Sequence, residues 1–228
     1  QNLFKGNTEL RSIEMPYVTT IGPSAFESCT NLEYVYAPVC SRIDPKGFRY
    51  CSSLSGEYYL SDKMRLIDFH AFEGTNVTSF VLHPDNVNFY TDGLGVYSAN
   101  ELVAFATGNV GINYEIKEKV EIAGVESDIT SIFERAMEGA KLNSLTIPKN
   151  INSVKKWALY GSTIQELNFY AENVDVNSYL INGTYYHPFE TATAHRLNIG
   201  NNVQNLPKLL FRYAKITQLV INSEKTTF

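Results

Sequence analysis

No apolar run in the sequence approaches the roughly 18 residues needed to span a lipid bilayer, so we expect no membrane insertion. The amino terminus, QNLFKGNTEL, lacks the charged and apolar regions of a signal peptide, which suggests a mature or excised fragment of a longer protein. Basic residues are few: 19 Lys and Arg against 24 Asp and Glu give a net charge of −5 at pH 7. Because nucleic-acid binding draws on clustered Lys and Arg, this composition argues against DNA or RNA as a partner.

The motifs that signal catalysis or metal binding are also missing. No GxSxG, phosphate loop or GxGxxG is present, and Gly93-Leu94-Gly95 is better explained by turns. The histidines show no HxH, HExxH or His/Cys spacing; they are His70, His83, His187 and His195. The sequence therefore predicts no metal site, no cofactor and no nucleophile.

A pair of catalytic carboxylates is not expected either. The candidates on exposed strand positions are Glu14, Glu57 and Glu166. Glu14 and Glu166 lie several repeats apart in a chain of stacked strands, and a glycosidase pair must lie within about 10 Å. We therefore expect a protein that is not an enzyme.

What the sequence does contain is a unit of about 22 residues that recurs along the chain. The stretch LEYVYAPVCSRIDPKGFRYCSS, residues 32–53, repeats the apolar skeleton of the residues before it. Pairs separated by 22 positions are Leu10 and Leu32, Ile13 and Val35, Ile21 and Ile43, Phe26 and Phe48, and Cys29 and Cys51. A fixed period in this range predicts a solenoid of stacked supersecondary units.

The period extends through the chain with two interruptions. Repeats are predicted to open near residues 10, 32, 54, 77, 120, 142, 164, 194 and 216, within a single domain over residues 1–228. Residues 85–113 and 174–193 depart from the pattern. Alternating apolar and polar residues around turn formers predict β-hairpin islands there.

Each half of the repeat has its own local pattern. In LxxVxA the fourth and sixth positions share a strand face, and a following Pro ends the strand, so the opening half is predicted to be a short strand. In IxxxAF, Ile21 and Ala25-Phe26 have helical spacing, which predicts a short helix or 3₁₀ turn. Stacking such units gives an α/β fold with a parallel sheet on one face and short helices on the other.

The skeleton of residues 10–54 resembles the BspA-type, or Treponema pallidum-type, leucine-rich repeat, LxxVxxPxxxxxIxxxAFxxCxxL. This resemblance implies a right-handed solenoid and a family of secreted or surface-anchored bacterial and protozoan proteins, several of them adhesins. It therefore implies an extracellular or cell-surface location. A GVY segment inside an island, as at Gly95-Val96-Tyr97, is also familiar in that family.

The three cysteines, an odd number, do not indicate a disulfide framework. Cys29 and Cys51 occupy one slot of successive repeats where a small buried side chain is needed, which favours free core thiols over a stacked Cys29–Cys51 bridge. Cys40 has no repeat partner and no catalytic context.

The candidate binding surface is the outward face of the predicted sheet. Its outward positions in the second, third and fourth repeats are Tyr34, Tyr36, Glu57, Tyr59, Ser79 and Val81. Exposed Tyr is a frequent anchor of protein interfaces and of sugar stacking, although Tyr also ladders between strands for structural reasons. The second island is rich in aromatic residues, namely Tyr179, Tyr185, Tyr186, His187 and Phe189. Two roles are compatible with them, lining a binding site or packing between repeats, and we favour packing.

Two functions are compatible with this pattern. The first is an extracellular binding or adhesion module that contacts a protein or glycan of a host or neighbouring cell through the sheet face. The second is a structural spacer in a larger surface protein, with no ligand of its own.

Overall fold

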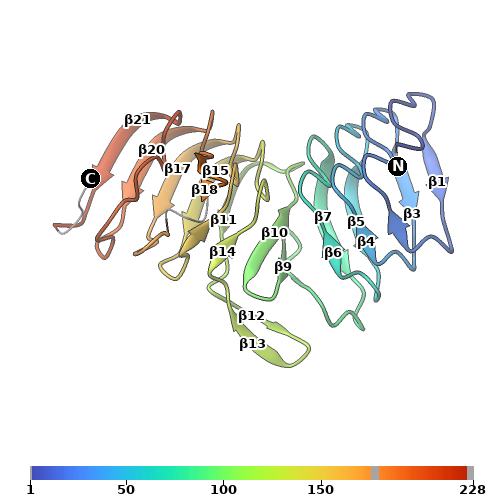
Figure 1. The fold of residues 1–228 in the computed structure, drawn as a ribbon, viewed down its shortest axis with the longest axis horizontal. Coiled ribbons are helices and arrows are strands. Elements are labelled where there is room, and N and C mark those ends of the chain that lie inside the picture. Colours follow the sequence, from blue (N-terminus) through green and yellow to red (C-terminus); the bar gives the residue numbers. More distant parts are fainter. Residues whose placement is uncertain (1, 176–179, 225–228) are drawn as a thin grey trace. The chain divides into compact units, whose positions relative to one another are not determined.

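The computed structural model describes residues 2–175 and 180–224 (Figure 1). The backbone contacts divide the chain into two compact units. The first unit comprises residues 1–99, 103–109 and 121–125, and the second comprises residues 100–102, 110–120 and 126–228. Among the described residues, no helix is long and apolar enough to cross a membrane.

One strand opens each repeat of the first unit: β1 (Ser12–Glu14), β3 (Tyr34–Tyr36), β5 (Ser55–Leu60) and β7 (Asn76–Leu82). β1 and β3 pair in parallel with Ile13 opposite Val35, which is the register that the 22-residue period predicts. β5 and β7 pair in the same way, with Tyr58 opposite Phe80. The predicted opening strands are therefore confirmed in this unit.

A second parallel sheet follows the opening strands. It consists of β2 (Thr20–Ile21), β4 (Arg42–Ile43) and β6 (Leu66–Ile67). Ile21, Ile43 and Ile67 lie opposite one another along the stack, and each is at most 3% exposed. The isoleucine of the repeat motif thus belongs to a short strand whose side chain enters the core.

The closing half of the repeat is a series of tight turns rather than the predicted short helix or 3₁₀ turn. Within the part of the chain that the structure describes, no residue lies in an α- or 3₁₀-helix. In the first repeat Ala25 N–H donates to the Gly22 carbonyl oxygen at 3.1 Å, with Pro23 and Ser24 between them. Ser24 has a φ of 53°, so Pro at the second position and positive φ at the third indicate a type II turn.

Hydrogen bonding between repeats explains why a helix does not form. Alternate N–H groups donate to the following repeat: Ser24 to Pro45, Phe26 to Gly47 and Ser28 to Arg49, at 2.7 to 3.0 Å. A helix would direct these donors to carbonyls four residues earlier in the same segment. The spacing of Ile21 and Phe26 fits both geometries, so the sequence pattern alone did not distinguish them.

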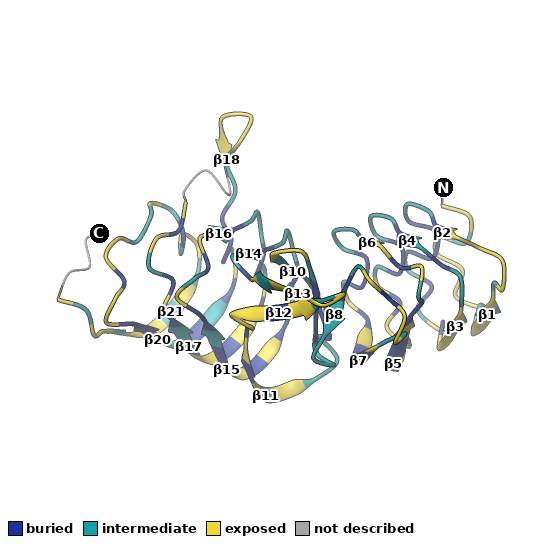
Figure 2. Ribbon diagram, turned by 90° about the horizontal axis from the view of Figure 1, so that it is seen from below, coloured by how far each residue is buried: buried dark blue, intermediate teal, exposed yellow. Residues whose placement is uncertain are grey.

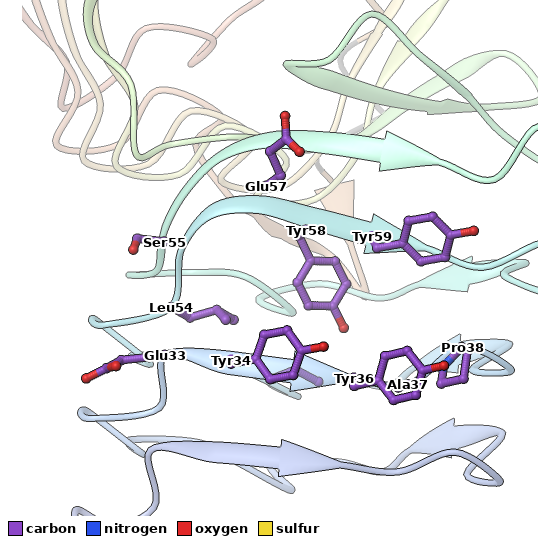
Figure 3. Close-up of a pocket in the computed structure, with 11 residues that line it drawn as sticks. Glu33, Tyr34, Tyr36, Ala37, Pro38, Leu54, Ser55, Glu57, Tyr58 and Tyr59 are labelled. Atoms are coloured by element: carbon purple, nitrogen blue, oxygen red, sulfur yellow. The ribbon is translucent and has the colours of Figure 1, made fainter.

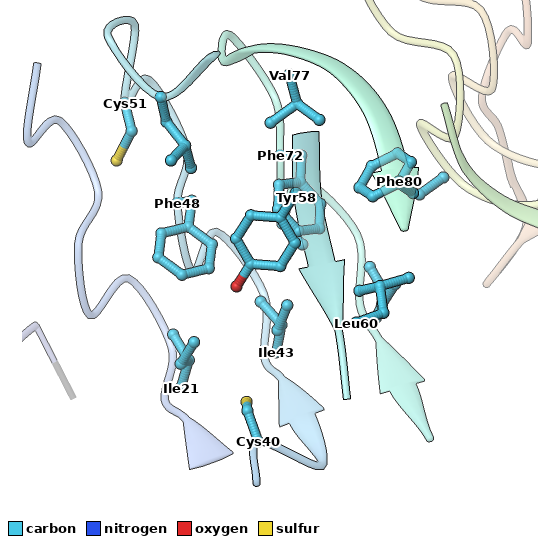
Figure 4. Packing of buried hydrophobic residues seen from close by; sticks show 14 of the residues in the cluster. Ile21, Cys40, Ile43, Phe48, Cys51, Tyr58, Leu60, Phe72, Val77 and Phe80 are labelled. Carbon is cyan, nitrogen blue, oxygen red and sulfur yellow. The ribbon is translucent and has the colours of Figure 1, made fainter. Parts of the chain in front are cut away.

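Aromatic rings stack along the core of the first unit (Figure 4). Phe48 lies between Phe26 and Phe72, with ring centroids 5.5 and 5.7 Å away. Phe4 continues the stack, 5.5 Å from Phe26 and nearly parallel to it. Residues 2–9 therefore supply the closing half of a further repeat, which was not predicted because the repeats were counted from their opening strands.

The first island contains the predicted hairpin. β8 (Tyr90–Thr91) and β9 (Gly95–Ser98) are antiparallel, and β10 (Glu101–Phe105) follows. The Asp92 carboxylate accepts hydrogen bonds from the N–H groups of Leu94 and Gly95 and so holds the turn. Tyr97 is fully buried, so this island is packed.

The second unit contains a five-stranded parallel sheet: β11 (Val110–Glu115), β15 (Lys141–Ile147), β17 (Thr163–Phe169), β20 (Thr193–Ile199) and β21 (Lys215–Ile221). Tyr114 of β11 lies opposite Leu145 of β15. The strand before the repeat at residue 142 is therefore β11, and not a segment opening near Val120 as predicted. The first island accordingly ends before residue 110 rather than at residue 113.

The alternating residues around Val120 belong to another element. β12 (Lys119–Ile122) and β13 (Val125–Asp128) form a two-stranded sheet of their own. Ala123 and Gly124 between them have φ values of 51° and 78°, as a two-residue type I′ turn requires. The alternating pattern around Val120 therefore correctly predicted a strand, but this strand is not part of the stack of repeats.

The remaining strands of the second unit are short. β14 (Ser131–Ile132) pairs with β16 (Ser153–Val154) and with the start of β10. β18 (Leu180–Ile181) and β19 (Thr184–Tyr185) form the predicted hairpin of the second island, which is largely exposed (Figure 2). Tyr179 lies outside the described residues.

The repeat pattern resumes directly after this hairpin, earlier than predicted. Leu159 N–H donates to the Pro188 carbonyl oxygen at 2.9 Å, the same bond that links successive turns in the first unit. Phe189 is 1% exposed and His187 is also buried. His187 and Phe189 therefore pack between repeats, as we favoured. The right-handed course of the solenoid stays a prediction that rests on the family resemblance.

Candidate functional site

The predicted site residues lie on three strands of the first unit. Tyr34 and Tyr36 are on β3, Glu57 and Tyr59 on β5, and Ser79 and Val81 on β7. The rings of Tyr34, Tyr36 and Tyr59 are 52%, 44% and 48% exposed. Ser79 lies opposite Glu57, and Val81 opposite Tyr59, so these four residues share one face of a two-stranded sheet.

The sheet is interrupted between the two tyrosine-bearing strands. β3 pairs with β1 in one two-stranded sheet, and β5 pairs with β7 in another. Among the described residues no ring contact joins Tyr34, Tyr36 and Tyr59, whereas Tyr59 makes an edge contact with His83 at 6.1 Å. The tyrosines thus do not form a ladder across adjacent rungs; they stand on opposite sides of a break.

A cleft of about 420 Å³ occupies this break (Figure 3). Its lining comes from both strands and their flanks: Glu33, Tyr34, Val35, Tyr36, Ala37, Pro38, Leu54, Ser55, Glu57, Tyr58 and Tyr59. Ser79 and Val81 are not part of the lining. The structure therefore brings Tyr34, Tyr36, Glu57 and Tyr59 together around one concavity and leaves the β7 residues beside it.

Two local features of the third repeat accompany the break. The third repeat has one residue more than the second between its opening leucine and its core slot, so that Tyr58 takes the slot that Val35 holds in the second repeat, and Gly56 within this stretch has a φ of 74°. The Tyr58 ring is 5% exposed and packs between Phe48 and Phe72, with centroids 5.6 and 4.7 Å away.

The cleft reaches down to the core layer. Val35 points inward, yet its side chain is only half-buried. The equivalent residues of continuous rungs in the second unit are Leu145, Leu167 and Leu197, and each is at most 1% exposed. The floor of the cleft therefore offers apolar surface that a neighbouring strand covers elsewhere.

The mouth of the cleft is acidic. Its lining residues include Glu33 and Glu57 and no Lys or Arg, and the two carboxylates extend outward at the rim, away from the tyrosine rings (Figure 3). Glu33 forms an ion pair with Arg11 at 3.0 Å, but both side chains are more than half exposed, so solvent screens the pair. Glu57 has no ion-pair partner among the described residues, and its charge is available to a ligand.

The outward face of the second unit differs from this arrangement. The Asn198 side-chain amide donates to Glu166 at 2.6 Å and to Asn168 at 2.8 Å, and its oxygen accepts from Arg196. Asn198 is only 8% exposed. These polar groups satisfy one another between rungs and so help to hold β17 and β20 together.

The cysteines carry no site. All three are free and buried. Burial raises the pKa of the Cys51 thiol to about 12, and it also raises the pKa values of Cys29 and Cys40. Because a thiol in this state does not ionise at neutral pH, none of the three is a nucleophile.

A smaller cleft of about 180 Å³ lies in the second unit, and the sequence analysis did not anticipate it. Its lining consists of Glu115, Glu118, Pro148, Lys149, Tyr170 and Asn202. These residues lie at or just after the carboxyl ends of β11, β15, β17 and β20. The cleft has one exposed aromatic ring, Tyr170, and carries less apolar surface than the first.

The repeat motif and the stacked parallel strands define a leucine-rich repeat protein. The BspA type leucine rich repeat region matches the chain in six copies, over residues 1–93 and 114–228. The chain therefore belongs to the BspA-type leucine-rich repeat family. No curated protein matches it.

Solved structures with a similar fold come from bacterial proteins. The pneumococcal vaccine antigen PcpA is 18% identical with a TM-score of 0.61, covering 96% of this chain and 58% of that one. A leucine rich cell surface protein from Faecalibacterium prausnitzii is 15% identical with a TM-score of 0.65, covering 99% and 63%. The chain thus spans about three fifths of the length of these proteins, and at this identity the likeness shows the fold.

Proposed function

We propose that the chain is a non-catalytic binding module of an extracellular surface protein, and that it contacts a protein or glycan of a host or neighbouring cell through the cleft between β3 and β5. The observation that carries this proposal is the placement of three half-exposed tyrosines around an apolar floor. Tyr supplies large contact area at low entropy cost and is enriched at binding hot spots.

The surface location rests on similarity. One of the similar structures is a vaccine antigen and the other is a cell surface protein. A vaccine antigen must be accessible to antibodies, which fits a protein displayed outside the cell. The same location would give the tyrosine cleft access to ligands on other cells.

Binding without catalysis fits the chemistry of the cleft. Its ionisable side chains are two carboxylates and the tyrosine hydroxyls. No imidazole, thiol or amine lines it to act as nucleophile or general base near neutral pH. The cleft can therefore hold a ligand by shape and aromatic contact, supported by negative charge.

The experiment is to measure binding of the purified chain to an array of host matrix proteins and glycans. A Tyr34/Tyr36/Tyr59 triple-alanine variant should lose binding while retaining the melting temperature of the parent, because these rings are half exposed. A matched control replaces three exposed residues outside the cleft, Tyr17, Val87 and Val125, with alanine. Equal binding by all three proteins would move the site elsewhere, and no binding by any would favour a structural spacer.

A further inference from the structure

The break between β3 and β5 leaves main-chain groups without a strand partner. Met15 N–H donates to the Tyr36 carbonyl oxygen at 2.7 Å, and Tyr34 N–H donates to that of Arg11, so Tyr34 and Tyr36 direct their main-chain groups toward β1. Since these directions alternate along a strand, the N–H and C=O of Val35 face the cleft. This is the pairing edge of β3.

The opposite wall has the same character. His83 N–H donates to the Leu60 carbonyl oxygen at 2.9 Å, which directs Leu60 toward β7. The main-chain groups of Tyr59, the preceding residue, therefore face the cleft. The edges of β3 and β5 that face the cleft are therefore unpaired. An unpaired strand edge is a template for another chain, so natural sheets usually cover such an edge or pair it.

We propose that the ligand of this cleft is an extended, basic segment of a partner polypeptide that adds as a strand to the free edge of β3. The inference rests on the proposed function, because it names the ligand class for the same cleft. Main-chain hydrogen bonds to Val35 supply the pairing, and alternate side chains of the segment meet the apolar floor and the tyrosine rings.

The length and charge of the cleft define the segment. Its β3 wall runs over residues 33–38. Six residues of extended chain span roughly 20 Å, so a six- to eight-residue peptide is sufficient. Glu57, which has no ion-pair partner among the described residues, and Glu33, whose exposed pair with Arg11 is screened by solvent, stand at opposite rims, which favours Lys or Arg in the segment.

A glycan would use the same tyrosines in a different way. Sugar rings stack on aromatic faces and have no regular series of amide donors and acceptors to pair with a strand edge. The Val35 amide therefore reports which ligand class occupies the cleft. We expect this amide to exchange rapidly with solvent in the free chain, while the paired amides of Tyr34 and Tyr36 exchange slowly.

The first test is a library of random eight-residue peptides screened against the folded chain. We expect the bound peptides to be enriched in Lys or Arg and in β-formers, and to protect the Val35 amide from hydrogen exchange. N-methylation of alternate residues of a bound peptide should weaken its binding at least tenfold, because the side chains remain while the main-chain donors are removed. Binding that survives N-methylation in both alternations would overturn the proposal.

Variants test the protein side of the same contact. Val35→Pro removes the N–H that faces the cleft without removing a bond to β1, and it should weaken peptide binding at least tenfold; Val35→Ile is the control that keeps the N–H. Should Val35→Pro fail to fold, Glu57→Gln provides an independent reading. It should weaken basic peptides at least threefold at low salt, whereas Glu121→Gln, which changes an exposed glutamate outside the cleft, should not.

The two proposals can fail separately. Tyrosine-dependent binding of glycans, with no peptide bound, would preserve the proposed binding function and refute strand addition. Loss of both glycan and peptide binding would refute both and leave the spacer. Tyrosine-dependent peptide binding with protection at Val35 would support both.

Discussion

The thiol of Cys51 donates a hydrogen bond to the carbonyl oxygen of Phe26, with 3.0 Å between sulfur and oxygen. Cys29 makes the same bond to Phe4, one repeat earlier and also at 3.0 Å. The Phe26 oxygen also accepts the N–H of Cys29, so the thiol engages the second lone pair of a buried carbonyl. The cysteine slot therefore links successive turns.

Cys51→Ala should destabilise the chain by about 1–3 kcal/mol. The substitution removes the donor to a buried carbonyl and leaves a small gap where the sulfur packed. Urea unfolding followed by far-UV circular dichroism would measure the change. Cys51→Ser is the informative companion, since it restores a donor but not the sulfur volume; if both variants were as stable as the parent, the bond would have no role in stability.

The thiols should resist alkylation until the chain unfolds. The pKa of Cys51 is raised to about 12 by burial, from an ordinary value of 9. Between pH 9 and pH 12 the unfolded state therefore loses the Cys51 proton while the folded state keeps it. The contribution of the neutral Cys51 thiol to stability is lost as pH rises from about 9 to about 12. Mass spectrometry after iodoacetamide should find three unmodified cysteines at pH 8 in buffer and three modified in denaturant. Rapid labelling in buffer would contradict the buried thiols.

Phe48→Ala should cost about 3–5 kcal/mol, because Phe48 is fully buried between Phe26 and Phe72. Tyr17→Ala removes a ring that is 90% exposed and should change stability by less than about 0.5 kcal/mol. Thermal unfolding of both variants measures the contrast. An unchanged melting temperature for Phe48→Ala would contradict the stacked core.

The 22-residue period was enough to predict the pairing register of β1 and β3. Ile13 lies opposite Val35 because both occupy the same slot of one motif, and that equivalence can be read from the sequence alone. Phe26, Phe48 and Phe72 were likewise predicted to be buried and are at most 7% exposed. Repetition makes such inferences reliable, because each unit supplies independent evidence for the others.

The break between β3 and β5 could not be predicted from the same pattern. The candidate residues Tyr34, Tyr36 and Tyr59 were identified from their outward positions, but the pattern placed them on adjacent paired strands. The third repeat differs from the second by one additional residue before the core slot and by the larger side chain of Tyr58 in that slot. Whether neighbouring strands stay paired after such a change depends on how Tyr58 packs against Phe48 and Phe72. These contacts join different repeats, so the pattern of a single repeat does not reveal them.

Acid stability should depend on Glu73. Burial raises the pKa of Glu73, but hydrogen bonds from His70 and Arg49 outweigh that effect and lower it to about 2 from an ordinary value of 4.5. Its contribution is therefore present above about pH 4.5 and is lost as pH falls from about 4.5 to about 2, by an amount on the order of 3 kcal/mol. The Glu73→Gln variant should be less stable at pH 7 and show a flatter decline in this window. Glu9→Gln, at an exposed site, is the control, and identical pH profiles for Glu73→Gln and the parent would refute the role.

The turns of the closing half give the last prediction, because one of their positions has positive φ in successive repeats of the described chain. Ser28 has a φ of 64° in the first repeat, and glycine occupies the same slot as Gly74, Gly139 and Gly161 in later repeats. A residue with a Cβ in this region costs roughly 1–2 kcal/mol, which glycine avoids at a smaller entropic cost.

Ser28→Gly should therefore raise the melting temperature slightly, by a free energy of up to about 1 kcal/mol. Gly139→Ala is the reverse test. Nothing lies within 4 Å of a Cβ added at Gly139, so any loss of stability there comes from backbone conformation and not from a clash. We expect a loss of about 1 kcal/mol by urea unfolding. A helix in place of the turns would give the opposite signs, since alanine favours a helix interior and glycine disfavours it.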